Sequence, residues 1–162
     1  MKIAIIYASR HGSTQKVAAM IADGLAGSHE AILFPVEQWP AIHLEDFDGI
    51  ILGTAIYAGR PSKKMYRYVT ETAYKNILQK KRIGLFICGL ETDLNKLEQE
   101  KEIAFPDYLK DRSVVFESAG GELNPEELSW FSKMIMKKVK GVTSSVSELS
   151  NEAIARIARA FI

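Results

Sequence analysis

The fold is decided by Lys2–Thr14, which reads KIAIIYASRHGST. Its first half, Lys2–Ala8, is a continuous apolar and β-branched run, which is typical of a strand buried on both faces of a parallel sheet. Its second half, Ser9–Thr14, is small and polar, and apolar residues then recur at helical spacing from Val17 to Leu25. The first predicted unit of the structure is therefore a strand, a polar loop and a helix.

Four more strands and four more helices are predicted from similar patterns. The strands are Ala31–Val36, Phe47–Thr54, Ile83–Gly89 and Ser113–Ala119. The helices are Pro61–Ala73, the charged and solvated Asp93–Ile103, Asn124–Val139 and Ser150–Phe161. Strands that alternate with helices imply a parallel sheet with right-handed crossovers. We therefore predict an α/β three-layer sandwich, in which a five-stranded parallel sheet carries helices on both faces.

The composition favours one globular domain over residues 1–162, because a chain with 47% hydrophobic and 25% charged residues forms a single core at this length. The net charge of +1 gives no field that would attract nucleic acid. One cysteine, Cys88, and three histidines offer no zinc-ligand spacing. No apolar run approaches the roughly 18 residues of a spanning helix, and no signal peptide is recognisable. We expect a cytoplasmic protein that holds no metal.

The loop after the first strand predicts a phosphate site, because ligands of open α/β sheets bind beyond the carboxyl ends of the strands. This loop offers three hydroxyls, a glycine for close backbone approach and the free N–H groups of a helix N-terminus. The alternative is a structural helix cap, with Ser13 or Gly12 at the N-cap. The predicted phosphate-binding residues are Ser9, Arg10, His11, Gly12, Ser13 and Thr14.

The loops after the third and fourth strands predict a site for a flat heteroaromatic ring, whose edge would bond to backbone groups. Packing is the alternative role of Tyr57, and Cys88 is interpreted as an ordinary buried thiol. The motifs GxxxxGKS/T and GxGxxG are absent, which disfavours nucleoside triphosphates and nicotinamide dinucleotides. The predicted ring-binding residues are Thr54, Ala55, Ile56, Tyr57, Ala58, Gly59, Cys88, Gly89 and Leu90.

Two of these segments, Ile5–Thr14 and Gly53–Gly59, resemble the flavodoxin superfamily. The resemblance implies flavin mononucleotide (FMN) as the cofactor, with its phosphate in the first loop and its isoalloxazine ring in the next two loops. It also implies the strand order 2-1-3-4-5, with the flavin at the point where the chain connections diverge. The flavin would carry the chemistry of an oxidoreductase, so we assign no catalytic side chain.

Within the superfamily, the chain is similar to the flavin-dependent protoporphyrinogen oxidases that use menaquinone. This likeness lies in Val115–Leu123, in Trp130–Lys137 and in the near-neutral charge. It implies protoporphyrinogen oxidation coupled to menaquinone, or a related electron transfer from flavin to quinone. The alternatives are a general flavin-dependent quinone reductase, an electron shuttle to redox proteins, and a binding module that has lost its flavin.

The predicted helix Asn124–Val139 carries apolar residues over roughly two thirds of its circumference. Four lysines flank this arc, and such a surface suits anionic lipid or a quinone. Packing between the sheet and the terminal helix is the alternative. The expected partners are therefore a quinone, porphyrin or other small molecule and a peripheral contact with the inner face of the membrane, and not nucleic acid.

Overall fold

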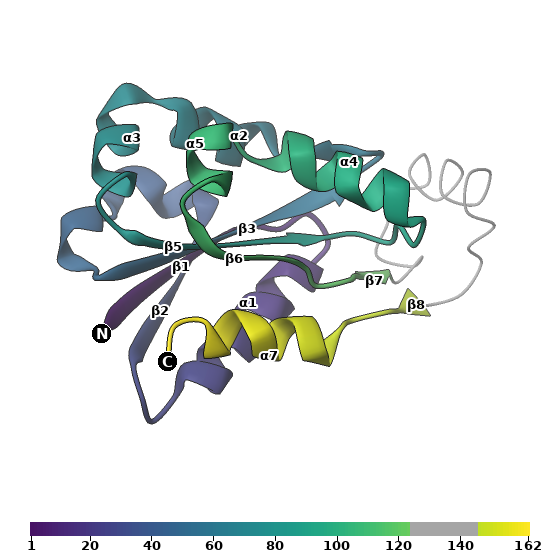
Figure 1. Ribbon diagram of the computed structural model, residues 1–162, viewed down its shortest axis with the longest axis horizontal. Helices are drawn as coiled ribbons and strands as arrows, with labels where there is room; N and C mark the ends of the chain where they lie inside the picture. The colour runs from purple at the N-terminus through teal and green to yellow at the C-terminus, as the bar shows by residue number, and fades with distance from the viewer. Residues whose placement is uncertain (124–145) are drawn as a thin grey trace.

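The computed structural model describes residues 1–123 and 146–162. A parallel sheet crosses its centre in the order β2-β1-β3-β5-β6 (Figure 1). When these five strands are numbered along the chain, the order is 2-1-3-4-5, so the predicted α/β class and topology are confirmed. The predicted helix Asn124–Val139 lies outside the described residues.

The five strands of this sheet are β1 (Lys2–Ala8), β2 (Glu30–Pro35), β3 (Gly49–Tyr57), β5 (Arg82–Cys88) and β6 (Ser113–Ser118). Three short strands lie outside this order, namely β4 (Arg60–Pro61), β7 (Glu122–Leu123) and β8 (Val146–Ser147). The helices are α1 (Ser13–Leu25), α2 (Lys63–Thr70), α3 (Thr72–Leu78), α4 (Leu94–Ala104), α5 (Asp107–Lys110) and α7 (Asn151–Arg159). Two 3-10 helices, η1 (Val36–Ala41) and η2 (Leu44–Asp46), follow β2.

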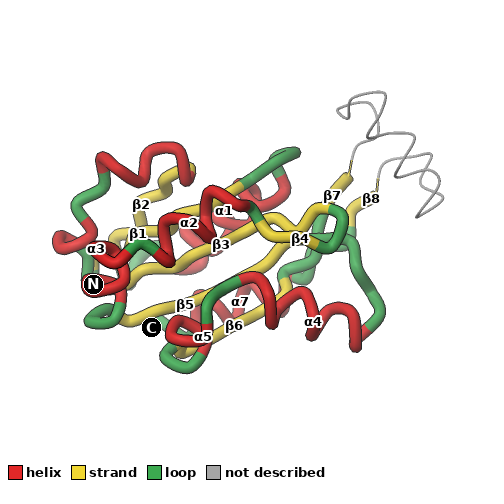
Figure 2. The backbone as a smooth tube through the Cα atoms, turned by 90° about the horizontal axis from the view of Figure 1, so that it is seen from above, coloured by secondary structure: helices red, strands yellow, loops and turns green. Residues whose placement is uncertain are grey.

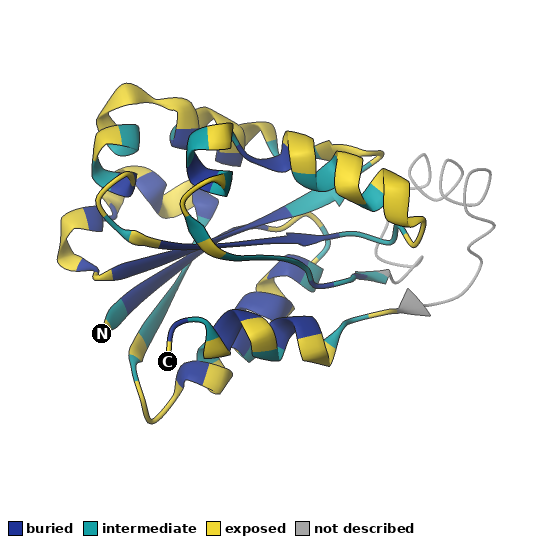
Figure 3. Cartoon of the chain, viewed as in Figure 1, coloured by how far each residue is buried: buried dark blue, intermediate teal, exposed yellow. Residues whose placement is uncertain are grey.

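Two apolar layers hold the helices against the sheet, because the side chains of each strand alternate between its faces. Ile3 and Ile5 of β1 belong to the layer beneath α1 and α7. Ala4 and Ile6 belong to the opposite layer, which is covered by the 3-10 helices, α2, α3 and α5 (Figure 1). The central strands are buried and the outward faces of the helices are exposed (Figure 3). The structure is therefore the three-layer sandwich that the sequence predicts.

The segment from β3 to α3 differs from the sequence prediction in two ways. The predicted helix Pro61–Ala73 is two helices, because the backbone at Glu71 is extended, with ψ of 129°. The Thr70 hydroxyl bonds the carbonyls of Tyr66 and Arg67 at 2.8 and 3.0 Å, and such a side-chain bond to the backbone competes with the helical ladder. Strand β3 also continues three residues past its predicted end, because β4 pairs with it.

The carboxyl ends of the parallel strands lie at the right of Figure 1. Figure 2 shows β4, β7 and β8 at this same end of the molecule. β4 pairs antiparallel with the end of β3, and β7 pairs antiparallel with β8. The loops that the sequence assigns to phosphate and ring binding therefore project from one end of the sheet.

Candidate cofactor site

A cavity of about 690 Å³ opens at the carboxyl end of the sheet. Its walls are the β1–α1 loop, the β3–β4 hairpin, the β5–α4 loop, α4 and the start of β7. Open α/β sheets bind ligands in this place, and cavities of this size hold small molecules. The predicted residues that line it are Arg10, His11, Ser13, Thr14, Ala55, Ile56, Tyr57, Ala58, Gly59, Cys88, Gly89 and Leu90. The phosphate loop and the ring loops therefore meet in one cavity.

Helix α1 begins at the cavity, and no side-chain hydrogen bond caps it. Its N-cap is Gly12, in the left-handed conformation with φ of 94°. The first helical hydrogen bond runs from the Lys16 amide to the Gly12 carbonyl at 3.0 Å. The amides of Ser13, Thr14 and Gln15 therefore precede the helical ladder, and no acidic residue lies in this first turn. Such a helix end attracts an anion through both its amides and its dipole.

The Thr14 hydroxyl is buried in the wall of this cavity. Thr14 is 1% exposed, and its Oγ1 atom has no nitrogen or oxygen partner within the described residues. Its neighbour is the Cys88 thiol, which is a weak hydrogen-bonding group. Burial raises the pKa of Cys88 to about 12, and the Thr14 hydroxyl opposes this rise only in part. Cys88 is therefore a protonated, buried thiol, as its sequence context predicts, and this weak group is the neighbour of the Thr14 hydroxyl within the described residues.

Three predicted site residues shape the loops and do not line the cavity. The Ser9 Oγ atom accepts a hydrogen bond from the Gly12 amide at 3.0 Å, which tightens the β1–α1 loop. Thr54 is fully buried, and its hydroxyl oxygen accepts a hydrogen bond from the Ser62 amide at 3.1 Å. This bond fixes the return of the β3–β4 hairpin. The structure therefore places Ser9, Gly12 and Thr54 in supporting positions.

The β3–β4 hairpin turns through two residues with positive φ. Tyr57 pairs with Arg60, and between them Ala58 has φ of 49° and Gly59 has φ of 71°. Positive φ at both central residues defines the tight hairpin turn that fits the twist of the strands. Glycine adopts this conformation at no steric cost, whereas Ala58 is strained by its Cβ atom. The strain lies directly in the cavity wall.

Arg10 and His11 pack on the aromatic ring of this hairpin. The Arg10 guanidinium carbon lies over the Tyr57 ring, 3.7 Å from its centroid. The His11 ring lies 5.9 Å from the Tyr57 ring, at an interplanar angle of 58°. The side chains of the predicted phosphate loop therefore reach the predicted ring loop, and Tyr57 contacts them from within the cavity wall.

The floor of the cavity is a close contact of two backbones. The Gly89 amide donates to the Gly120 carbonyl at 3.1 Å. A Cβ atom on Gly121 would lie 2.9 Å from the Gly89 carbonyl oxygen, so a larger residue at Gly121 would push the loops apart. The sequence assigns ring binding to backbone groups here, and the structure shows that the Gly89 amide already has a protein partner.

The sequence prediction missed the α4 wall of the cavity. Lys96, Gln99, Glu100 and Ile103 line it at helical spacing i, i+3, i+4 and i+7. Most of α4 is exposed, as its charge predicts, so the stripe is hidden among similar charged residues. Its period is the one signal that marks it. Glu91, Gly121 and Glu122 complete the wall, and Glu122 pairs with Lys16 of α1 at 2.7 Å.

In residues 1–123 and 146–162, no group of three or more His, Cys, Asp or Glu side chains is arranged to hold a metal ion. No helix in that part of the chain has the length and apolar character to cross a membrane.

Comparison with known proteins identifies the family. A flavodoxin from Clostridium saccharobutylicum is 32% identical over 79 residues, which are 48% of this chain and 49% of that flavodoxin. The chain thus spans about half the length of this curated relative. Oxidised Flavodoxin 2 from Bacillus cereus matches 99% of the chain with 97% of its own, at a TM-score of 0.56 and 24% identity.

A second solved structure has the same fold. The flavodoxin, WrbA-like protein from Agrobacterium tumefaciens matches 98% of the chain with 94% of its own, at a TM-score of 0.53 and 20% identity. The flavodoxin domain family itself matches residues 4–150, which is most of the chain. The chain therefore belongs to the flavodoxin domain family.

Proposed function

We propose that the cavity binds FMN and that the chain is an electron-transfer protein of the flavodoxin type. The observation that carries this proposal is the uncapped N-terminus of α1, which opens beside the buried Thr14 hydroxyl, a group with no nitrogen or oxygen partner among the described residues. Both lie in one cavity with the ring loops. Membership of the flavodoxin domain family supports the same cofactor.

The residues present fit the two parts of FMN. The amides of Ser13, Thr14 and Gln15, with the Ser13 and Thr14 hydroxyls, would hold the phosphate. The segments Ala55–Gly59 and Cys88–Leu90 would border the isoalloxazine ring. Bound FMN supplies the redox chemistry, and the protein supplies position, burial and charge around the ring.

A shuttle to redox proteins is the reaction that we favour, because the relatives and structures that match the chain are flavodoxins and flavodoxin-like proteins. The protein partner is inferred from this family membership. A cytoplasmic location and a membrane contact through residues 124–139 remain predictions from the sequence.

Electron transfer to a quinone is the second candidate. Tyr57, Leu90 and Ile103 line the cavity, and Ile103 is 48% exposed, so apolar side chains of the wall are accessible from solvent. A neutral, planar acceptor such as menaquinone fits these side chains. An anionic porphyrin fits less well, because the carboxylates of Glu91 and Glu100 lie in the same wall.

Flavin content and electron delivery test the proposal. The purified protein is expected to show the yellow absorption of bound flavin, or to acquire it when FMN is added. The protein is then reduced without oxygen and mixed with an oxidised one-electron redox protein or with an oxidised menaquinone analogue. A sample without any acceptor is the blank.

Fast reduction of the redox protein with a slow quinone reaction supports the shuttle. The reverse order supports the quinone enzyme, and oxidation of protoporphyrinogen at a matching rate restores the oxidase prediction. A chain that binds no flavin contradicts all three.

A further inference from the structure

Arg10 occupies an unusual place for a residue of a phosphate loop, because its guanidinium lies over the face of Tyr57. Both residues line the cavity, and Tyr57 ends the strand that continues into the β3–β4 hairpin. The pair therefore ties the β1–α1 loop to the ring loop.

This charge is permanent, and within the described residues Arg10 forms no ion pair, although Glu91, Glu100 and Glu122 line the same cavity. None of the ion pairs found in residues 1–123 and 146–162 involves Arg10. A guanidinium does not lose its proton in proteins, and its planar shape stacks well on an aromatic ring. Apolar side chains of Ile56 and Leu90 also line this cavity, but Arg10 itself is exposed, so water screens its charge in part.

A flavin ring changes charge when it is reduced. The oxidised ring takes up two electrons and one proton, so the reduced ring carries one more negative charge than the oxidised ring. A nearby fixed cation stabilises that added charge by Coulomb attraction. An arginine held at the ring loop therefore acts on the redox state of the ligand, whereas an arginine on the phosphate acts equally on both states.

We propose that Arg10, held on Tyr57, raises the affinity of this site for reduced flavin relative to oxidised flavin and acts from the ring side of the cavity. The proposal rests on the proposed function, because it requires that flavin binds here. Arg10 would shift the relative affinity for the two redox forms, and Tyr57 is its positioning residue. The phosphate has its own donors in the α1 amides and the Thr14 hydroxyl.

The test compares Arg10→Gln with the unchanged full-length protein. Oxidised FMN and riboflavin are titrated by fluorescence quenching, and the reduced forms are assessed by potentiometric titration with dithionite. We expect Arg10→Gln to lower the ratio of reduced to oxidised affinity by about three- to tenfold. A tenfold loss corresponds to a midpoint potential about 30 mV lower for a two-electron couple. The loss is expected for FMN and riboflavin alike.

Three more variants separate position from charge. Arg67→Gln is the matched control, because Arg67 is an exposed arginine 5.9 Å from the Tyr68 ring and does not line the cavity. It removes the same charge and is expected to leave the ratio unchanged. Arg10→Lys keeps the charge without the planar group and is expected to lose part of the effect. Tyr57→Leu removes the aromatic support and is expected to lower the ratio in the same direction as Arg10→Gln.

The outcomes separate a failure of the inference about Arg10 from a failure of the proposed function. If Arg10→Gln weakens FMN equally in both redox states and spares riboflavin, Arg10 is a phosphate ligand and this inference is wrong, while the proposed function stands. An unchanged ratio, or an equal drop in Arg67→Gln, also overturns the inference. If the unchanged protein binds no flavin, the proposed function itself fails. Arg10 is exposed, so thermal melting of each variant checks that the fold is retained.

Discussion

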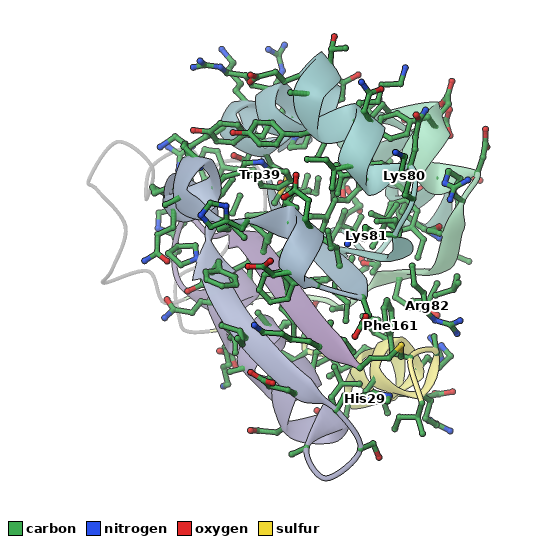
Figure 4. All side chains as sticks on the ribbon, turned by 90° about the vertical axis from the view of Figure 1, so that its left-hand side faces the viewer. His29, Trp39, Lys80, Lys81, Arg82 and Phe161 are labelled. Carbon is green, nitrogen blue, oxygen red and sulfur yellow. The ribbon has the colours of Figure 1, made fainter. Side chains whose placement is uncertain are left out.

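The two ends of the sheet use similar side chains in opposite ways. At the amino end, His29 Nε2 lies 2.7 Å from the Phe161 carbonyl, and an Arg82 NH2 group donates to the Ala160 carbonyl at 2.6 Å. The Lys81 ammonium donates to two carbonyls before β3, at 2.6 and 2.9 Å. Figure 4 shows His29, Arg82 and Phe161 gathered beside the C-terminal helix α7. These polar side chains all contact backbone carbonyls and so hold neighbouring segments together.

At the carboxyl end, the comparable groups face a cavity. The Thr14 hydroxyl has no nitrogen or oxygen partner within the described residues, and Arg10 lies on an aromatic ring, not on a carbonyl. The amides that open α1 are likewise left outside the helical ladder. The partner, and not the residue type, therefore separates a structural polar group from one that is available to a ligand. Substitutions at the amino end should therefore change stability, and those at the carboxyl end should change binding.

The largest effect is expected from Phe161→Ala at the amino end. Phe161 is 1% exposed and packs over Gly49 and Gly84, where a Cβ atom would lie 2.8 and 2.7 Å from its ring. Truncation leaves a cavity over the sheet and costs about 3 to 5 kcal/mol of unfolding free energy. Urea unfolding measures this loss. FMN affinity of the folded fraction should stay unchanged, and a parallel loss of affinity would show that the two ends are coupled.

A smaller loss of stability is expected from Lys81→Met. The substitution keeps much of the apolar stem but removes the ammonium that bonds two backbone carbonyls. The loss of a charged hydrogen-bond donor from these carbonyls should lower the unfolding free energy by about 1 to 3 kcal/mol. Lys80→Met, next to it in the chain, is the control for loss of charge. Equal destabilisation by both variants would argue against the specific role of Lys81.

Thr14→Val should show the opposite pattern, with binding weakened and stability retained. The methyl group replaces a buried hydroxyl that has no nitrogen or oxygen partner among the described residues, so unfolding free energy should stay the same or rise. FMN binding should weaken by about 1 kcal/mol, the contribution of one hydrogen bond. Isothermal titration and urea unfolding on the same sample measure both quantities. A marked loss of stability would mean that this hydroxyl is structural.

The smallest effect is expected from Ala58→Asn in the β3–β4 hairpin. Asparagine followed by Gly59 is a preferred pair for a turn with two positive φ values. Replacement of the strained alanine should raise the unfolding free energy by about 0.5 to 1 kcal/mol. The melting temperature should rise slightly with it. A fall in melting temperature would show that the Ala58 conformation differs from the one described.

The sequence predicts the strands and the sheet topology well. The central strands are continuous apolar segments, and polar or glycine-containing loops mark where they end. Strand β1 has the predicted bounds, and Ser150 caps α7 as the predicted start of that helix, by accepting the Ala153 amide at 3.2 Å. The β3–β4 hairpin was missed, because Arg60–Pro61 resembles the start of a helix when read locally. Its strand pairing depends on contacts with β3 that no local pattern encodes.

The candidate site was predicted at its loops and missed at its helix wall. Glycines and hydroxyls after a buried strand indicate a ligand directly, since those residues serve backbone approach and anion binding. The α4 stripe through Lys96 and Glu100 has no such mark, because charged residues are equally common on a solvated face. The contact of Gly89 with Gly120 was also hidden, since it joins residues from two different loops.

The most direct test of the central claim is the preference for FMN over riboflavin, which differ only in the phosphate. Fluorescence quenching is measured for the unchanged protein and for Ser13→Ala with Thr14→Ala. We predict that the unchanged protein prefers FMN and that the double variant loses about 1 to 3 kcal/mol of FMN affinity while its riboflavin affinity is unchanged. Equal losses for both ligands, or no initial preference, would contradict the assignment of the α1 N-terminus as the phosphate site.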